Sequence, residues 1–327
     1  MNNNFYSGRF DSIQAMRGLA ALSVVFDHII FIKNGAFGVD IFFCISGFIM
    51  MYVTHISTKH FLLKRAVRII PLYYFMTFVT FAGLLIAPGL FDKTVADAGY
   101  LVKSLLFLPP VCGGPAQPVV KVGWTLNYEV FFYIIIWAAL LINKKYRGLI
   151  ASGIICVVVG IGYLSGNDCT IMFEFIYGIL AYEVLKRIDY SKKASGETAI
   201  RMYKDISLVL IALCCYIFMW FVEYIPALND INRIVSYGIP AFILFVCLFA
   251  GLYEKKLPSA FVFVGNISYS VYLLHYFVAR LFNKFGDSIP KIAIVLLVMA
   301  ISIGLGTISY YIFEKKVSKY LRIKLKI

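Results

Sequence analysis

The chain has 327 residues, of which 61% are hydrophobic and 15% are charged. A soluble domain carries about 25% charged residues, so the composition excludes an ordinary soluble domain and indicates a chain whose main solvent is lipid. The net charge of +14 would suggest nucleic-acid binding in a soluble protein. Here the lysines and arginines lie in short segments between apolar runs, which predicts membrane topology and no nucleic-acid partner.

Ten apolar runs approach the length that a bilayer core about 30 Å thick requires, which is roughly 20 residues per helix. They predict an all-α fold, a polytopic helical membrane bundle of about ten transmembrane helices, in a single domain over residues 1–327. The seven cysteines show no metal-ligand spacing, so no metal site is expected. The predicted spans are 13–33, 38–54, 71–90, 122–142, 148–165, 170–186, 206–225, 235–252, 261–283 and 291–313.

The basic loops predict the orientation of the spans. A segment rich in Lys and Arg follows every even-numbered run, and the opposite loops carry few such residues. Because cytoplasmic loops carry the excess of Lys and Arg, both termini are expected to be cytoplasmic. The basic segments are 59–68, 144–147, 186–204, 255–256 and 315–326.

Several of the predicted spans contain ionisable groups, and the first contains Arg17 and His28, eleven residues apart. An ionisable group in hydrocarbon costs at least about 2.5–3.5 kcal/mol, so each needs a partner or a function. At 100° per residue the two side chains share one helix face, about 16 Å apart along the axis. His28 is open to acid–base chemistry or to a structural hydrogen bond. Arg17 is either its site partner or a cytoplasmic anchor.

Carboxylates open two further runs. Asp40 lies near the start of the second run, where a helix N-terminus favours a carboxylate, so it either caps that helix or belongs to the site. Gly47, further along, would permit close helix packing. Glu129, in the fourth run, has no cation nearby in the sequence, so its partner must come from another helix. In the ninth run, Ser270 and His275 belong to a polar series typical of a helix-packing seam.

The stretch 60–71, HFLLKRAVRIIP, predicts a short amphipathic helix at the cytoplasmic interface, with Pro71 opening the next span. Arg65 and Arg68 are neighbours on one face of such a helix because they stand three residues apart. Two interpretations remain open. The pair either anchors anionic lipid or clamps phosphate, since the guanidinium fork binds phosphate oxygens bidentately.

Five motifs occur in one order along the chain: RGLAALSVVFDH, FGVDIFFCISGF, RAVRIIPLYY, WTLNYEVFFY and SYSVYLLH. Together they resemble the acyltransferase-3 family of bacterial inner-membrane proteins, which acylate, mostly acetylate, sugar hydroxyls of lipopolysaccharide, exopolysaccharide or capsule. The resemblance extends from the first run to the ninth and is thin between about 145 and 260. One departure is FEKK near the C-terminus, where Lys316 replaces the proline of many family members.

The resemblance implies a role for each motif residue. It makes His28 the essential histidine and Arg17 its motif partner. Arg65 and Arg68 match the Arg–x–x–Arg motif linked to the acyl donor, and Glu129 matches the acidic position of the Trp–(Ser/Thr)–Leu–x–x–Glu motif.

The implied enzyme is an O-acyltransferase, multi-pass in the bacterial inner (cytoplasmic) membrane. It would hold no permanent cofactor and would use acetyl-CoA, or another acyl-CoA, as donor substrate. The acceptor would be a hydroxyl of a cell-surface glycan or a lipid-linked glycan. His28 would act as general base or accept the acyl group itself, and Glu129 or Asp40 would orient the acceptor or fix the tautomer of His28.

Two further expectations concern partners and the alternative function. The resemblance is to the stand-alone form without an SGNH domain, working alone or with a separate periplasmic transferase. The alternative is a transporter or flippase of a glycan or lipid-linked intermediate, because intramembrane charges also mark substrate paths. Inverted repeats and broken helices would favour the transporter, and the sequence shows neither.

Overall fold

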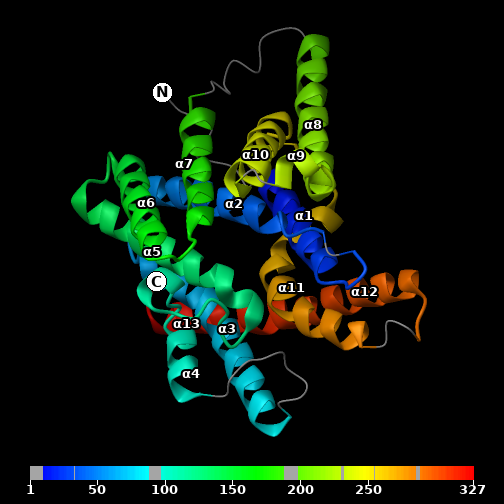
Figure 1. The fold of residues 1–327 in the computed structure, drawn as a ribbon. Helices are drawn as coiled ribbons and strands as arrows, with labels where there is room; N and C mark the ends of the chain where they lie inside the picture. Colours follow the sequence, from blue (N-terminus) through cyan, green and yellow to red (C-terminus); the bar gives the residue numbers. More distant parts are fainter. Residues whose placement is uncertain are drawn as a thin grey trace. The chain divides into compact units, whose positions relative to one another are not determined.

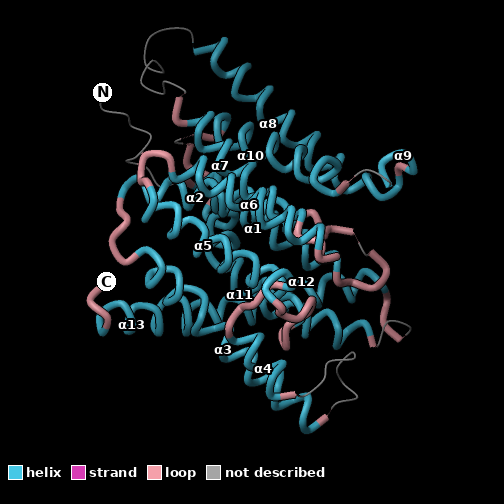
Figure 2. The backbone as a smooth tube through the Cα atoms, turned by 60° about the vertical axis from the view of Figure 1, so that its left-hand side comes forward, coloured by secondary structure: helices cyan, strands magenta, loops and turns pink. Residues whose placement is uncertain are grey.

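The computed structural model describes residues 10–32, 34–87, 97–187, 198–229, 232–253, 255–284 and 288–327. All regular elements within these ranges are helical, as Figure 2 shows, which confirms the all-α prediction. Figure 1 labels the main helices in chain order. They are α1 (Asp11–Asp27), α2 (Gly38–Ile56), α3 (Phe61–Ile86), α4 (Ala98–Leu105), α5 (Trp124–Ile142), α6 (Arg147–Leu164), α7 (Phe173–Leu185), α8 (Thr198–Phe221), α9 (Pro226–Asn229), α10 (Ile239–Gly251), α11 (Ser259–Asn283), α12 (Lys291–Ser309) and α13 (Ser318–Lys324).

Eight helical stretches among the described residues are long and apolar enough to cross a membrane. They match eight of the ten predicted runs. The first and sixth runs form the shorter helices α1 and α7, of 17 and 13 residues, so the count of ten stays a prediction. The orientation of the termini also stays a prediction, and most of the basic segment 186–204 on which it partly rests lies outside the described residues.

The separate interfacial helix predicted for 60–71 is wrong. Helix α3 runs without a break from Phe61 to Ile86, with Pro71 inside it. Proline removes one backbone hydrogen bond from a helix, but spanning helices tolerate this loss because their surroundings satisfy the freed carbonyl. At 1.5 Å per residue the 26 residues of α3 extend about 39 Å. The helix is therefore longer than the hydrocarbon core, and Arg65 and Arg68 lie near its first end.

The chain divides into two compact units, and each is described by itself. The first comprises Met1–Ser57, Ile171–Ser268 and Ala279–Met299. Within it α2 packs on α7, and α8 packs on α10 (Figure 1). A Cβ atom on Gly47 would overlap the carbonyl oxygen of Phe175, and one on Gly178 would overlap that of Cys44. The close packing predicted for Gly47 is confirmed, because only glycine lets the two backbones approach this far.

The second unit comprises Thr58–Thr170, Tyr269–Val278 and Ala300–Ile327. Helix α3 contacts α4, α5 and α13 within it. The middle of α11 is held by two tyrosines, since the Tyr269 hydroxyl donates to the Ile69 carbonyl at 2.8 Å and the Tyr272 hydroxyl to the Val122 carbonyl at 2.9 Å. His275 is fully buried on the same helix. This part of α11 is a polar packing seam, as the sequence predicts.

Candidate functional site

His28 lies immediately after α1, as the residue that caps its C-terminal end. Its Nδ1 atom is 2.9 Å from the carbonyl oxygen of Val24. A carbonyl only accepts hydrogen bonds, so Nδ1 is the donor, and in the neutral form of the ring the lone pair is then on Nε2. The His28 side chain is 24% exposed. This tautomer leaves Nε2 as the atom that can take a proton or attack an acyl carbon.

The backbone around His28 is held by Asn283, the last residue of α11. The Asn283 amide nitrogen donates to the His28 carbonyl at 2.9 Å, and its amide oxygen accepts from the backbone N–H of Ile30 at 3.2 Å. One side chain thereby fixes the chain on both sides of the histidine. The sequence did not reveal the contact of Asn283 with this turn, because it joins positions 255 residues apart.

Arg17 lies in the regular part of α1, about three helical turns before His28. Its guanidinium donates to the Gln14 side-chain oxygen at 3.3 Å, and the residue is partly buried. Asp27 does not orient His28 by a hydrogen bond, since its carboxylate is 3.9 Å from Nδ1. The Nδ1 proton is instead donated to the Val24 carbonyl.

Asp40 is fully buried in the first turn of α2 and pairs with Arg233. The guanidinium donates to both carboxylate oxygens, from Nε at 3.1 Å and from Nη2 at 2.5 Å, and Nη2 also donates to the carbonyl of Ala36. Burial by itself lowers the pKa of Arg233, but Asp40 raises it above its ordinary value. Arg233 is therefore a permanent cation, and the sequence missed it because it lies 193 residues from Asp40.

Glu174, at the start of α7, is also fully buried and interacts electrostatically with Asp40 and Arg233. Two carboxyl groups thus share one guanidinium. A buried carboxylate without its own cation favours its protonated form, so the cluster of Asp40, Glu174 and Arg233 is best described as one ion pair with an adjacent carboxylic acid.

Arg68 and Glu129 belong to a network in the second unit. Arg68 interacts electrostatically with Glu129, Glu314 and Tyr133. The Tyr133 hydroxyl donates to the Glu129 carboxylate, and the Glu314 carboxylate accepts from the Ser270 hydroxyl at 2.7 Å. The prediction that Glu129 finds its cation on another helix is confirmed, because Arg68 is on α3 and Glu129 is on α5.

Arg65, one turn earlier on α3, is placed differently. Its Nε atom is buried and has no hydrogen-bond partner among the residues that the structure describes. Leaving a buried donor unsatisfied costs about 1–3 kcal/mol, and more for a charged group. The residue also lines a recess of about 190 Å³ whose other walls are mostly apolar, including Phe107 and Tyr133. An acceptor that enters beside Arg65 would remove this cost.

The structure thus gathers the sequence-predicted residues into two sets. Arg17, His28 and Asp40 belong to the first unit, and Arg65, Arg68 and Glu129 belong to the second. Arg233, Glu174 and Asn283 join the first set, and Glu314 and Ser270 join the second. The sequence alone did not predict these partnerships.

The family model described as an acyltransferase domain matches residues 10–311. The exopolysaccharide production protein ExoZ of Rhizobium meliloti is 35% identical over 162 residues, 46% of this chain and 50% of the relative. The peptidoglycan O-acetyltransferase OatA of Listeria monocytogenes is 26% identical over 314 residues, 83% of this chain and 50% of the relative. The putative peptidoglycan O-acetyltransferase YrhL of Bacillus subtilis is 25% identical over 358 residues, 93% and 54% respectively.

The chain spans about half the length of these curated relatives. No solved structure matches it. The spanning helices and the membrane acyltransferase relatives together make the chain a multi-pass membrane protein. The family model covers far more than half of the residues, so the chain belongs to the acyltransferase-3 family.

Proposed function

We propose that the chain is an O-acyltransferase that moves an acyl group, usually acetyl, from a cytoplasmic acyl-CoA to a hydroxyl of a cell-surface glycan. The observation that carries this proposal is the tautomer of His28. Its Nδ1 proton is committed to the Val24 carbonyl, so the opposite nitrogen is the basic one. A base of this kind is what transfer to a sugar hydroxyl requires, and the relatives include O-acetyltransferases.

The step balances with His28 as general base. Nε2 takes the proton of the acceptor hydroxyl while the oxygen attacks the thioester carbonyl. The tetrahedral intermediate then expels the CoA thiolate, which takes the proton back from the imidazolium. In the two-step variant Nε2 attacks the thioester and expels the CoA thiolate. The sugar oxygen then attacks the acyl-imidazolium, the imidazole leaves with its Nε2 lone pair restored, and the hydroxyl proton goes to the thiolate. Both routes use the same nitrogen.

The donor is supported by Arg65. A buried guanidinium nitrogen without a partner is suited to a phosphate oxygen, because guanidinium–phosphate hydrogen bonds are charge-assisted. Arg68 interacts electrostatically with both Glu129 and Glu314, and Arg65 interacts with Glu129 but keeps a buried nitrogen that has no hydrogen-bond partner among the described residues. Of the two arginines, Arg65 is thus the better placed to meet the anionic donor.

The acceptor is supported by the relatives' names, which concern exopolysaccharide production and peptidoglycan O-acetylation. Both are glycans assembled at or outside the cytoplasmic membrane, and we therefore place this protein in the bacterial inner membrane. An exopolysaccharide, capsule, O-antigen or lipid-linked precursor offers the same chemical group, a sugar hydroxyl.

The donor assignment predicts different effects for the two arginines. Arg65→Gln is expected to raise the KM for acetyl-CoA about tenfold or more, the loss of one charge-assisted contact, while the protein stays folded. Arg68→Gln should instead reduce thermal stability, because it removes a buried cation that interacts with both Glu129 and Glu314. Steady-state kinetics and thermal unfolding of the purified variants measure both. An unchanged KM for Arg65→Gln would remove Arg65 from the donor site.

The experiment that tests the function compares cell-surface polysaccharide from the native strain, a deletion strain and the complemented strain by proton NMR. We expect the O-acetyl signals to disappear on deletion and to return on complementation, with the shifted sugar protons naming the acceptor. If the polysaccharide keeps its acetyl groups but changes in amount or location, the protein is a transporter or flippase instead.

A further inference from the structure

The last helical stretch is longer than a membrane requires. Residues Lys291–Lys324 form one stretch of 34 residues, which at 1.5 Å per residue extends about 51 Å. A hydrocarbon core of about 30 Å leaves roughly 20 Å of it beyond the membrane. The polar composition of its second end, which includes α13, indicates that this end is the part outside lipid.

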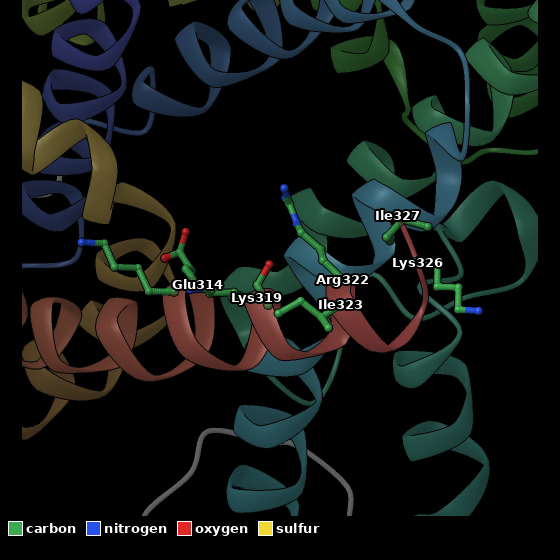
Figure 3. A pocket seen from close by; sticks show the side chains of 8 residues that line it. Glu314, Lys319, Arg322, Ile323, Lys326 and Ile327 are labelled. Atoms are coloured by element: carbon green, nitrogen blue, oxygen red, sulfur yellow. The ribbon is translucent and has the colours of Figure 1, made fainter.

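An open hollow of about 700 Å³ lies along this end. Its basic residues are Lys315, Lys319, Arg322 and Lys326, at positions i, i+4, i+7 and i+11. Lys319 and Arg322, three residues apart in α13, are neighbours on one helix face, and Lys326 lies just past the end of that helix. We call this feature the basic hollow. Figure 3 shows Arg322 extending from the helix on the same side as Glu314.

One residue of the basic hollow interacts electrostatically with Arg65, the arginine proposed to bind the acyl donor. Arg322 lies close enough to Arg65 to interact with it, and Arg65 also feels the charge of Arg68. All three residues belong to the same compact unit. The guanidinium groups repel one another, and Glu129 and Glu314 offset part of this charge within the same network. The arginines and the lysines of the hollow together still carry an excess of positive charge, which suits a polyanionic ligand.

The rest of the lining fits a nucleotide better than a bare phosphate. Ile323 and Ile327 supply apolar surface beside the cations, and Glu314 places a negative charge near one end. Lys315 already lies over the rings of Tyr310 and Tyr311, at 5.4 and 4.6 Å. Ligand pockets combine apolar walls with a few placed polar groups, and volumes of roughly 300–1,000 Å³ are usual for small molecules.

We propose that the basic hollow binds the nucleotide end of acyl-CoA, with Lys319 and Arg322 holding its 3′-phosphate while Arg65 meets its diphosphate. This inference rests on the proposed function, because it assumes that the donor is acyl-CoA. It assigns specificity-determining residues that lie outside every motif of the family resemblance.

The test compares CoA with 3′-dephospho-CoA, which lacks only the 3′-phosphate. The full chain in phosphatidylcholine nanodiscs is titrated with each ligand, and the dissociation constants are measured calorimetrically. The native protein is expected to bind CoA at least about tenfold more tightly, the usual value of a charge-assisted contact. In Lys319→Gln/Arg322→Gln the preference should fall to about one, with the constant for 3′-dephospho-CoA nearly unchanged.

The matched control is Lys316→Gln/Lys324→Gln, which removes the same charge from the same helix end but not from the lining of the hollow. It should keep the preference for CoA. If the native protein binds CoA and 3′-dephospho-CoA equally, the hollow does not read the 3′-phosphate and the inference fails while the proposed donor stands. If the native protein binds neither ligand, the proposed donor fails as well.

Anionic lipid is the competing occupant, because basic helix ends also bind lipid headgroups. Phosphatidylcholine nanodiscs exclude it, and a second titration in nanodiscs containing phosphatidylglycerol measures it. We expect phosphatidylglycerol to leave the ratio of the two constants unchanged. A ratio that collapses to one when phosphatidylglycerol is present would identify the hollow as a lipid site and overturn the inference.

Discussion

His28→Asn is expected to abolish O-acetylation while the protein inserts and folds normally. The asparagine amide nitrogen stands close to where Nδ1 stands and can still donate to the Val24 carbonyl, so the end of α1 is preserved. What disappears is Nε2, the base or nucleophile. Loss of a positioned base lowers rates by about 10²–10⁴-fold, enough to remove O-acetyl signals from the surface glycan by proton NMR at equal protein level.

The matched control is His55→Asn, at an exposed histidine in the last turn of α2. It should leave O-acetylation at the native level. Normal acetylation by well-expressed His28→Asn would contradict the assignment of His28 to the chemistry. It would also show that Nε2 of His28 is neither the base nor the nucleophile of the transfer.

Much of the fold could be predicted because lipid imposes simple rules on a chain. The lengths of the apolar runs predicted eight stretches that are long enough to cross a membrane. Close packing at Gly47 was predicted because small residues let helices approach each other. The prediction failed at Pro71. Proline before a long apolar run is typical of a helix start, but α3 continues through it, and only the packing around a spanning helix decides between the two.

Individual residues of the candidate site could be predicted from the sequence, but their partners could not. Glu129 stands out because a charge is costly in lipid, and Arg65 and Arg68 stand out because two arginines three residues apart share one helix face. Nothing in the sequence indicates that Arg68 interacts with both Glu129 and Glu314, or that Arg65 keeps a nitrogen without a hydrogen-bond partner among the described residues. Arg233 was missed because nothing in the sequence pairs a single loop arginine with a carboxylate 193 residues away. Pairings of this kind depend on tertiary contacts between distant segments.

Arg233→Met is the second substitution for which we expect a large effect, here on stability. It removes the only cation seen beside the buried carboxyls of Asp40 and Glu174 within the described residues. Removing one partner of a buried pair typically costs about 3–5 kcal/mol, which should appear as a clear fall in the thermal unfolding midpoint of the purified protein. Lowering the pH should restore part of the loss, because protonation removes the unpaired charges.

Two further variants at Asp40, with Arg187→Met as a control, distinguish a structural role of this cluster from a catalytic one. Asp40→Asn/Arg233→Met should be more stable than Arg233→Met alone, because it no longer buries a second carboxylate without a cation. Arg187→Met, at an exposed arginine after α7, should have no effect. Asp40→Asn alone leaves Glu174 to balance Arg233, so its fold should persist. If its activity is also native, Asp40 serves the fold, and if transfer is lost while the protein stays folded, Asp40 belongs to the chemistry of His28.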